Sequence, residues 1–428
     1  MSPESNPILI VGAGIIGLIL GQALKQRNIP FTIYERDPHL SSRHQGWAIT
    51  LHWALSHLPS LLPRDVLNRI EEVQVDQTVA KNDTGNFLYL NLRSGDVHWR
   101  IPPNRRWRVN RERLRGALLQ GIESHVHWGR KVEGVQLDDD SDGKPRVLYR
   151  QTDSEPQGDR PDEVQLSAPF NLIIGAEGPK SRIRQFLCPE SYENTPLPVR
   201  FTGVSVSLTR DEIAPLRRLD PLLFQGTHPD SGVFFWFSML DAPDPEQEAK
   251  GGQEALYKVQ LGISWPVRNE DTDCVPAENA ARLENMKRRA EGFVPFLYEV
   301  IQSIPEGTEV IEVTLADWEG PPASDDLGNG KGWDNHDGRV ILIGDAAHAM
   351  TMYRGEAANH GILDVYHLIS AIEKIESGQD RKSAITEYED EMQERGRNAV
   401  RLSRKACLEA HEWESLGVGS AILAGRKL

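Results

Sequence analysis

Three glycines near the N-terminus have the spacing of a dinucleotide-binding turn. Gly12, Gly14 and Gly17 follow the apolar residues 8–11 and open a strongly apolar stretch, and Glu35 follows a second apolar run. In a strand–turn–helix unit the first glycine allows the tight turn, the second lets a pyrophosphate approach the backbone, and the third lets helix and strand pack closely. The helix N-terminus attracts phosphates, and Glu35 would accept hydrogen bonds from an adenosine ribose. The pattern predicts a dinucleotide site and does not distinguish NAD from FAD.

Two later segments repeat the pattern of a short apolar run that ends in a glycine and an acid. Residues 170–174 lead into Gly175-Ala176-Glu177-Gly178, and residues 339–343 lead into Gly344-Asp345-Ala346-Ala347-His348. Such runs are typical of buried parallel strands, whose carboxyl ends share the sheet edge at which ligands bind. Three strand ends that are distant in the sequence are therefore expected to meet at one ligand.

These motifs, in this order, resemble those of the FAD-dependent aromatic hydroxylases of the para-hydroxybenzoate hydroxylase type. Residues 344–348 are similar to that family's GD motif and residues 175–184 to its DG motif. The stretch Gly46-Trp47-Ala48-Ile49-Thr50-Leu51-His52-Trp53 is similar to fungal FAD monooxygenases of secondary metabolism. The resemblance spans residues 12–360, and it implies that FAD is the bound cofactor.

The resemblance also implies which residues bind FAD. Asp345 would hydrogen-bond the ribityl chain, Arg111 would reach the cofactor, and a helix starting within residues 355–359 would direct its first amides to the flavin pyrimidine ring. A helix N-terminus there would stabilise the negative charge of reduced flavin. The full expected set is Gly12, Gly14, Gly17, Glu35, Arg36, Ala48, Arg111, Asp345, Gly355 and Ala358.

By resemblance, the reaction is a monooxygenation. The resemblance implies that NADPH or NADH docks transiently and reduces the flavin, which agrees with the lack of a second glycine fingerprint in the sequence. Dioxygen would add at C4a, and the hydroperoxide would transfer one oxygen atom to the substrate. Hydroxylation, epoxidation and Baeyer–Villiger insertion share that chemistry.

Two other interpretations stay open at this point. Glu177 and Ala357 stand where the family has Asp and Gly, which would suit a flavin-binding regulatory protein without turnover. A flavin halogenase is the second, although only Trp99-Arg100-Ile101-Pro102 of its Trp-x-Trp-x-Ile-Pro signature occurs.

The fold class expected from these elements is α/β, with a Rossmann-like FAD-binding domain. Its first part would occupy residues 1–194, including a hairpin insert at about 130–168. Residues 195–320 read as an inserted β-rich substrate domain, because they carry several strand-like runs. Residues 321–428 would complete the FAD-binding domain and add C-terminal helices.

The inserted segment suggests what the substrate looks like. Residues 234–237 read Phe-Phe-Trp-Phe, and alternate side chains of such a strand could line a cavity. We find no paired-arginine clamp for a small carboxylate in this segment, where Arg200 is the lone candidate for a catalytic arginine. We therefore expect a sizeable, mostly apolar, electron-rich aromatic, indole or polyketide-like substrate, with dioxygen as co-substrate.

The composition excludes several other classes. The 428 residues contain 48 Lys and Arg against 63 Asp and Glu, a net charge of -15 that argues against a nucleic-acid partner. The apolar stretch 8–20 is too short to span a bilayer, so no stable membrane insertion is expected. Three widely spaced cysteines and the histidines lack metal-ligand spacing, so no metal is expected, and they suit a reducing, cytoplasmic compartment.

Overall fold

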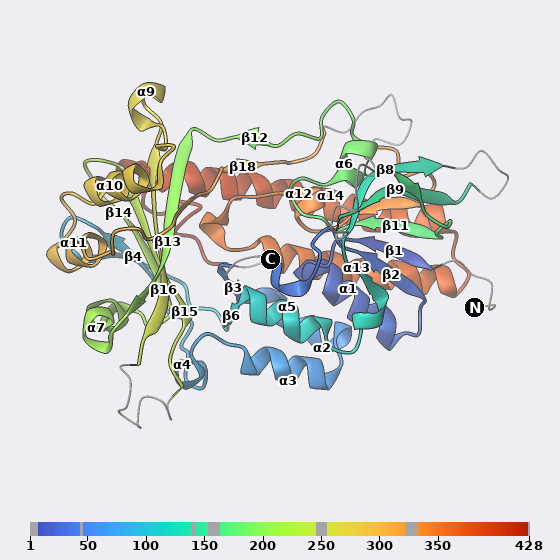
Figure 1. Cartoon of the computed structure of the whole chain (residues 1–428), viewed down its shortest axis with the longest axis horizontal. Coiled ribbons are helices and arrows are strands. Elements are labelled where there is room, and N and C mark those ends of the chain that lie inside the picture. Colours follow the sequence, from blue (N-terminus) through green and yellow to red (C-terminus); the bar gives the residue numbers. More distant parts are fainter. Residues whose placement is uncertain are drawn as a thin grey trace.

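The computed structural model describes residues 7–42, 46–137, 143–152, 163–244, 255–321 and 332–426. They form two parts that lie side by side along the long axis of the molecule, each built around one large sheet (Figure 1). Residues 138–142, which belong to the expected hairpin insert, lie outside the described residues.

The first part is the predicted Rossmann-like unit. Its sheet is parallel throughout, and the strands follow the order β19 (Val340–Leu342), β11 (Leu172–Gly175), β1 (Ile8–Val11), β2 (Phe31–Tyr34) and β7 (Val126–His127). All four residues of β1 are buried, which explains the unbroken apolar run there. This order brings the three strands with glycine motifs next to one another.

Helices complete this part. The helix α1 (Ile15–Gln26) is buried on nearly every side because it packs against both α5 (Arg111–Leu119) and α13 (Ala357–Glu376). Gly378, at φ +103°, separates α13 from the long α14 (Arg381–Glu409), so the expected C-terminal helix pair is confirmed. The shorter helices are α2 (Leu58–Leu61), α3 (Arg64–Glu72), α6 (Arg182–Leu187) and α12 (Asp345–His348).

A small sheet covers the same part. It pairs β8 (Arg130–Leu137) with β9 (Pro145–Gln151), and β9 with β10 (Gln165–Leu166). This is the hairpin insert expected at about 130–168.

The second part is a seven-stranded sheet in which one neighbouring pair, β14 and β4, is parallel and the others are antiparallel. Its order is β17 (Val310–Glu312), β13 (Val199–Leu208), β16 (Tyr257–Pro266), β15 (Phe234–Asp241), β14 (Leu223–Thr227), β4 (Phe87–Asn91) and β5 (Val97–Ile101). Helices α4 (Gln77–Ala80), α7 (Arg210–Leu219), α9 (Glu270–Asp273), α10 (Asn279–Arg289) and α11 (Pro295–Gln302) surround it. Because β4 and β5 pair with β14, the sheet is not confined to residues 195–320 as expected.

Two short strand pairs lie between the two large sheets. β12 (Thr195–Pro196) pairs with β18 (Ala316–Asp317), so the chain enters and leaves the inserted segment through adjacent strands. β3 (Ala48–Leu51) pairs with β6 (Trp107–Asn110). The long helix α14 runs along both parts, and the chain then returns to the region between them (Figure 1).

Candidate functional site

The carboxyl ends of three parallel strands meet at one edge of the first sheet, as their motifs predict. Gly12, after β1, has φ +108°, and a Cβ there would lie 2.7 Å from the carbonyl oxygen of Ala176, after β11. The amide of Ile343, at the end of β19, donates to the carbonyl of Gly175 over 3.0 Å. Three segments that are distant in the sequence therefore form one cluster of turns.

The glycines of the first turn serve different purposes. A Cβ at Gly17 would lie 2.1 Å from the carbonyl oxygen of Gly12, so only glycine lets α1 pack on this turn. A Cβ at Gly14 would meet nothing closer than Ala176 at 4.0 Å. Helix α1 begins after Gly14 without a side-chain cap, so its first amides face an open space suited to an anion.

Glu35 lies beside this turn and is 3% exposed. Its Oε2 accepts a hydrogen bond of 2.7 Å from the amide of Ala13, and its Oε1 accepts one of 3.0 Å from the amide of Asp37. Arg115, which the sequence analysis missed, lies 3.3 Å from the same carboxylate and donates to the carbonyl of Ala13. The acid is therefore fixed at the edge where a ribose would lie.

Asp345 opens α12 at the third turn, among several cations. Burial raises the pKa of its carboxyl, while the charges of His348, Arg111 and Arg184 lower it. Arg184 itself is 1% exposed, and its Nε and Nη1 have no hydrogen-bond partner. The structure thus brings Asp345 and Arg111 to one site, together with an arginine that has donors to spare.

Glu177 acts within the second motif. Its carboxylate accepts hydrogen bonds from the Ser181 hydroxyl and from the amides of Arg182 and Ile183, at 2.5, 2.8 and 3.1 Å. Burial raises its pKa. The longer side chain therefore turns back onto the first turn of α6 and stabilises the motif.

The start of α13 is tied to β3. The side-chain oxygen of Asn359 accepts from the amide of His52 over 2.9 Å, and its amide group donates to the carbonyl of Thr50 over 3.0 Å. The His52 Nε2 lies 3.3 Å from the carbonyl of Gly355, and burial lowers the pKa of His52 to about 4. A Cβ at Gly355, which has φ +66°, would meet nothing within 4 Å.

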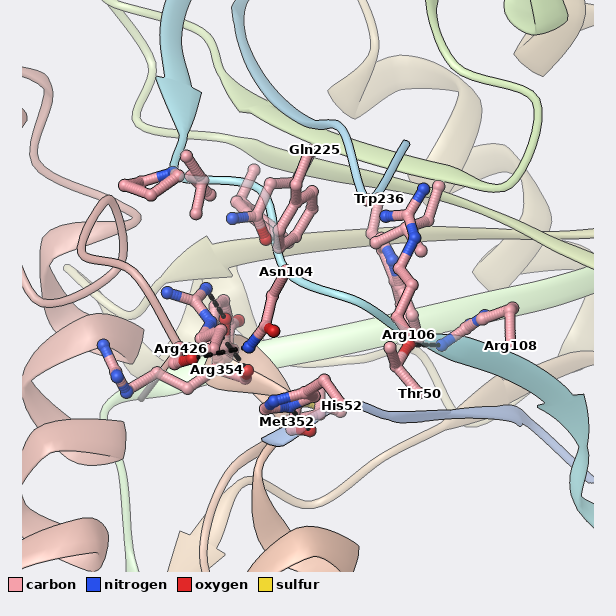
Figure 2. A pocket seen from close by; sticks show the side chains of 18 of the residues that line it. Thr50, His52, Asn104, Arg106, Arg108, Gln225, Trp236, Met352, Arg354 and Arg426 are labelled. Carbon is pink, nitrogen blue, oxygen red and sulfur yellow. Dashed lines mark hydrogen bonds between the residues drawn. The ribbon is translucent and has the colours of Figure 1, made fainter. Parts of the chain in front are cut away.

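A cavity of ≈ 730 Å³, counting its mouth, lies between this start of α13 and the second sheet (Figure 2). Thr50, His52, Met352 and Gly355 line the first side. Aromatic and aliphatic side chains line the other, namely Phe87, Phe201, Leu223, Phe234 and Trp236. Within β15 the alternation is regular, because Phe235 and Phe237 pack in the core behind the sheet. The aromatic run therefore supplies both core residues and, at alternate positions, cavity walls, which the sequence left open.

Known proteins resemble this chain over most or all of its length. Residues 333–403 match the family model "FAD binding domain", and residues 10–61 match "NAD(P)-binding Rossmann-like domain". A "Probable FAD-dependent monooxygenase" of Arthroderma benhamiae is 39% identical over 100% of this chain and 97% of its own length. The chain belongs to the FAD-dependent monooxygenases.

Two further comparisons agree. The FAD-dependent monooxygenase dbaB of Emericella nidulans is 38% identical over 84% of this chain and 84% of its own. The crystal structure of 2,6-dihydroxypyridine-3-hydroxylase from Arthrobacter nicotinovorans matches with a TM-score of 0.70 and 18% identity, covering 99% of this chain and 98% of that one. The latter likeness concerns the fold, since the sequences have diverged.

The residues present fit the FAD of this family. The space at Gly14, the uncapped start of α1 and the spare donors of Arg184 suit a pyrophosphate and its neighbouring groups. The start of α13 also lacks a side-chain cap, and the open side of Gly355 adjoins it. Each of these features leaves room or donors for a ligand that has an anionic pyrophosphate in its middle and a planar ring at its end.

The other expected FAD residues lie close to these. Ala48 pairs with Asn110 across β3 and β6, and Arg111 follows directly. Ala358 is half-buried in the first turn of α13. Arg36, by contrast, is exposed beyond Glu35.

Arg200 is not brought to this monooxygenase's cavity. Its guanidinium pairs with Glu270 over 2.7 Å and is 28% exposed. The next residue, Phe201, lines the cavity instead, because successive residues of β13 point to opposite faces of the sheet. The expectation of a catalytic Arg200 therefore finds no geometric support.

The cavity is also less apolar than expected. Four arginines line it, Arg106, Arg108, Arg354 and Arg426. In Figure 2, Arg354 and Arg426 lie at one end of the cavity and Arg106 and Arg108 at the other. The last two are separated by one residue, a spacing that places two side chains on one face of a strand and that could have been noticed. The expectation that a paired-arginine clamp is missing concerned residues 195–320, and all four arginines lie outside that segment.

Within the described ranges, no three His, Cys, Asp or Glu side chains gather to hold a metal ion. No helix there is both long enough and apolar enough to cross a membrane.

Proposed function

We propose that this chain uses NADPH or NADH and dioxygen to oxygenate a sizeable, electron-rich aromatic, indole or polyketide-like molecule. One observation carries the proposal. A single cavity is lined on one side by the start of α13 and the His52 segment, and on the other by aromatic side chains from the second sheet. A planar substrate packed on Trp236 and Phe234 would face the part of the chain that the family uses for its flavin.

The residues of the turn cluster would hold FAD. Gly14 and the first amides of α1 would receive the pyrophosphate, Glu35 the adenosine ribose, and Asp345 with Arg111 the ribityl end. When bound, FAD supplies the redox chemistry, accepting electrons from NADPH or NADH and activating dioxygen. We infer that the amides at Ala357 and Ala358 stabilise negative charge on the reduced ring.

The chain's own contribution is to bind the substrate and exclude water. Phe234 is 3% exposed and Phe201 is 1% exposed, so the cavity wall is closed to solvent behind them. The hydrogen bonds of Asn359 fix β3 against the start of α13 and so hold the elements of the first side of the cavity together. His52 is neutral at pH 7 because its pKa is about 4, and its ring N–H is directed to the carbonyl of Gly355.

The names of similar proteins support this reaction type. The Arthrobacter nicotinovorans enzyme is named as a hydroxylase of an aromatic heterocycle, and the Emericella nidulans relative as an FAD-dependent monooxygenase. The fungal origin of the relatives favours a metabolite built in secondary metabolism.

Substrate-stimulated NADPH oxidation tests the proposal. The purified FAD-loaded protein would be screened against phenols, aromatic polyketides and prenylated indoles, with product masses recorded. We expect faster NADPH oxidation and a product heavier by one oxygen atom for at least one of the larger compounds. Coupled turnover of salicylate or 4-hydroxybenzoate alone would contradict the proposed substrate class. NADPH oxidation that yields only hydrogen peroxide with every compound would favour the regulatory alternative.

We also propose a cytoplasmic location. All three cysteines are described and free, and Cys188 and Cys407 are buried as thiols. Thiols persist in a reducing compartment. Fractionation with a fluorescent fusion would test this, and secretion of the fusion would contradict it.

A further inference from the structure

The four arginines of the cavity differ in how their charges are balanced. Arg106 pairs with Asp83 over 2.8 Å and lies 3.6 Å from Asp220. Arg354 pairs with Glu356 over 2.5 Å. Within the described ranges, neither Arg108 nor Arg426 has a carboxylate within ion-pair distance.

Arg426 donates hydrogen bonds from each of its three guanidinium nitrogens. They are directed to the backbone carbonyls of Tyr353, Arg354, Ile422 and Ala424. Four of its five N–H groups are thus bound to the backbone, so its main effect is to add positive charge to the cavity.

Arg108 is different, because its guanidinium is only partly satisfied. The side chain is 4% exposed. Its Nη1 donates to the Thr50 hydroxyl over 2.6 Å, and its Nη2 donates to the Ser238 hydroxyl. Its Nε has no hydrogen-bond partner. Both partners are neutral, so they fix the direction of the guanidinium and leave its charge unbalanced.

An unbalanced buried cation is costly for a fold. Burial and the charge of Arg106 lower the pKa of Arg108 to about 9, so the side chain is still a cation at pH 7. Burying such a charge destabilises the fold unless a counter-charge lies beside it. A negatively charged ligand in the cavity would supply this counter-charge, and its binding would be favoured for that reason.

The surroundings of Arg108 indicate what the ligand is. The guanidinium carbon lies 5.7 Å from the centre of the Trp236 ring, which lines the same cavity. Figure 2 shows Arg108 reaching Thr50 at the cavity edge below Trp236. An aromatic molecule that contacts Trp236 in this cavity would therefore have a charged group within reach of this arginine.

We propose that Arg108 binds an oxyanion of the aromatic substrate, either a carboxylate or an ionised phenol or enol, and so sets which edge of the substrate faces the flavin side of the cavity. This proposal rests on the proposed function, because the anion belongs to the molecule that is oxygenated. It replaces the expectation of a mostly apolar ligand with that of an aromatic ligand with one acidic group. The positive cavity would also concentrate such anions against the net charge of -15.

Inert ligand pairs test the proposal without turnover. The FAD-loaded protein would be titrated with benzoate, 2-naphthoate and 2-anthroate, and with the matching neutral alcohols, while the flavin absorbance is recorded. We expect at least one carboxylate to bind tenfold or more tightly than its alcohol. Arg108→Met should remove that preference, and Arg108→Lys should retain part of it. A nitrophenol titrated at pH values below and above its ionisation distinguishes a phenolate site from a carboxylate site.

Two measurements keep the result interpretable. Arg93→Met removes an exposed arginine that pairs with Asp230, and it should leave every dissociation constant unchanged. The FAD-to-protein ratio and the circular dichroism of Arg108→Met should equal those of the wild type.

Several outcomes would overturn the proposal. They are an anion preference that survives in Arg108→Met, the absence of binding by every carboxylate and phenolate, or loss of FAD from Arg108→Met, which would assign the arginine to the cofactor. Because these probes need no NADPH, a failure here leaves the oxygenation assay readable. Conversely, an anion preference without any oxygenated product would count against the proposed function alone.

Discussion

His348 and Asp364 form a completely buried pair, in which the imidazole Nε2 lies 2.7 Å from the carboxylate Oδ2. The same oxygen accepts from the amide of Gly344 over 2.7 Å, and the other oxygen accepts from Arg395. One carboxylate on α13 thus holds the turn that precedes Asp345. The charges of His348 and Arg395 keep the pKa of Asp364 well below its usual range, against the effect of burial.

The first prediction concerns this carboxylate. Asp364→Asn should lower the free energy of unfolding by about 3 kcal/mol, because it leaves a buried arginine and a turn amide poorly paired. FAD retention should fall with it, since Gly344 and Asp345 lose their support. Urea unfolding and the FAD-to-protein ratio measure both effects.

Glu391→Gln is the matched control. It removes an exposed partner of the same Arg395 and should cost less than about 1 kcal/mol. Equal losses for the two variants would contradict the special position of Asp364.

The second prediction separates two acids of the motifs. Asp345→Ala should weaken FAD retention more than Glu177→Ala, because Asp345 lies among Arg111, Arg184 and His348 at the turn cluster. Glu177 is occupied by Ser181 and the amides of α6, so its loss should cost stability of about 1–2 kcal/mol, as for a helix cap. FAD titration of each apoprotein measures the difference. Equal FAD affinities would show that this ranking is wrong.

Much of the fold is predictable because it is encoded locally. The unit of β1, α1 and β2 follows from apolar runs and glycines within residues 8–34, and the division between α13 and α14 follows from Gly378. The pairing of β4 with β14 could not be predicted in this way, because residues 88 and 224 carry no local sign that they are neighbours.

The same contrast between local and non-local information applies to the site. The turn cluster can be predicted from the sequence because each of its acids closely follows an apolar run. The role of the cavity arginines cannot be predicted in this way, because it depends on which residues the fold places around each arginine. Arg108 is informative only once Thr50 and Ser238 are seen to be its neutral partners, and Arg426 only once the chain end is seen to return to the cavity.

The third prediction concerns stability below neutral pH. Burial lowers the pKa of His52 and His411 to about 4 and that of His360 to about 2, against an ordinary value of 6.5. The unfolded chain therefore binds more protons than the folded one once the pH falls below 6.5. Stability is complete above that pH and declines below it, by at most about 1.4 kcal/mol per pH unit for each histidine.

Urea unfolding of the FAD-saturated protein between pH 7.5 and pH 5 measures this decline, with pH values chosen on either side of 6.5. His411→Gln should reduce the slope, because one proton fewer is taken up on unfolding. A flat stability profile would contradict the burial of these neutral rings.

The fourth prediction concerns Gly14 and Gly17, two glycines of the first turn whose surroundings differ in how much space they leave for a Cβ. Gly14→Ala should fold, because its Cβ would have 4.0 Å of clearance and the backbone there, at φ -74° and ψ 179°, suits any residue. The methyl group would instead occupy the space assigned to the pyrophosphate, so FAD affinity should fall at least tenfold. Gly17→Ala should fail to fold or lose much of its stability, since its Cβ would lie 2.1 Å from the carbonyl of Gly12.

Gly116→Ala in α5, with its nearest contact at 3.9 Å, is the control and should change neither FAD affinity nor stability. Fluorescence titration with FAD and urea unfolding of each apoprotein distinguish the cases. Wild-type FAD affinity in Gly14→Ala would mean that the pyrophosphate does not approach this turn, and the assignment of the first motif would have to be abandoned.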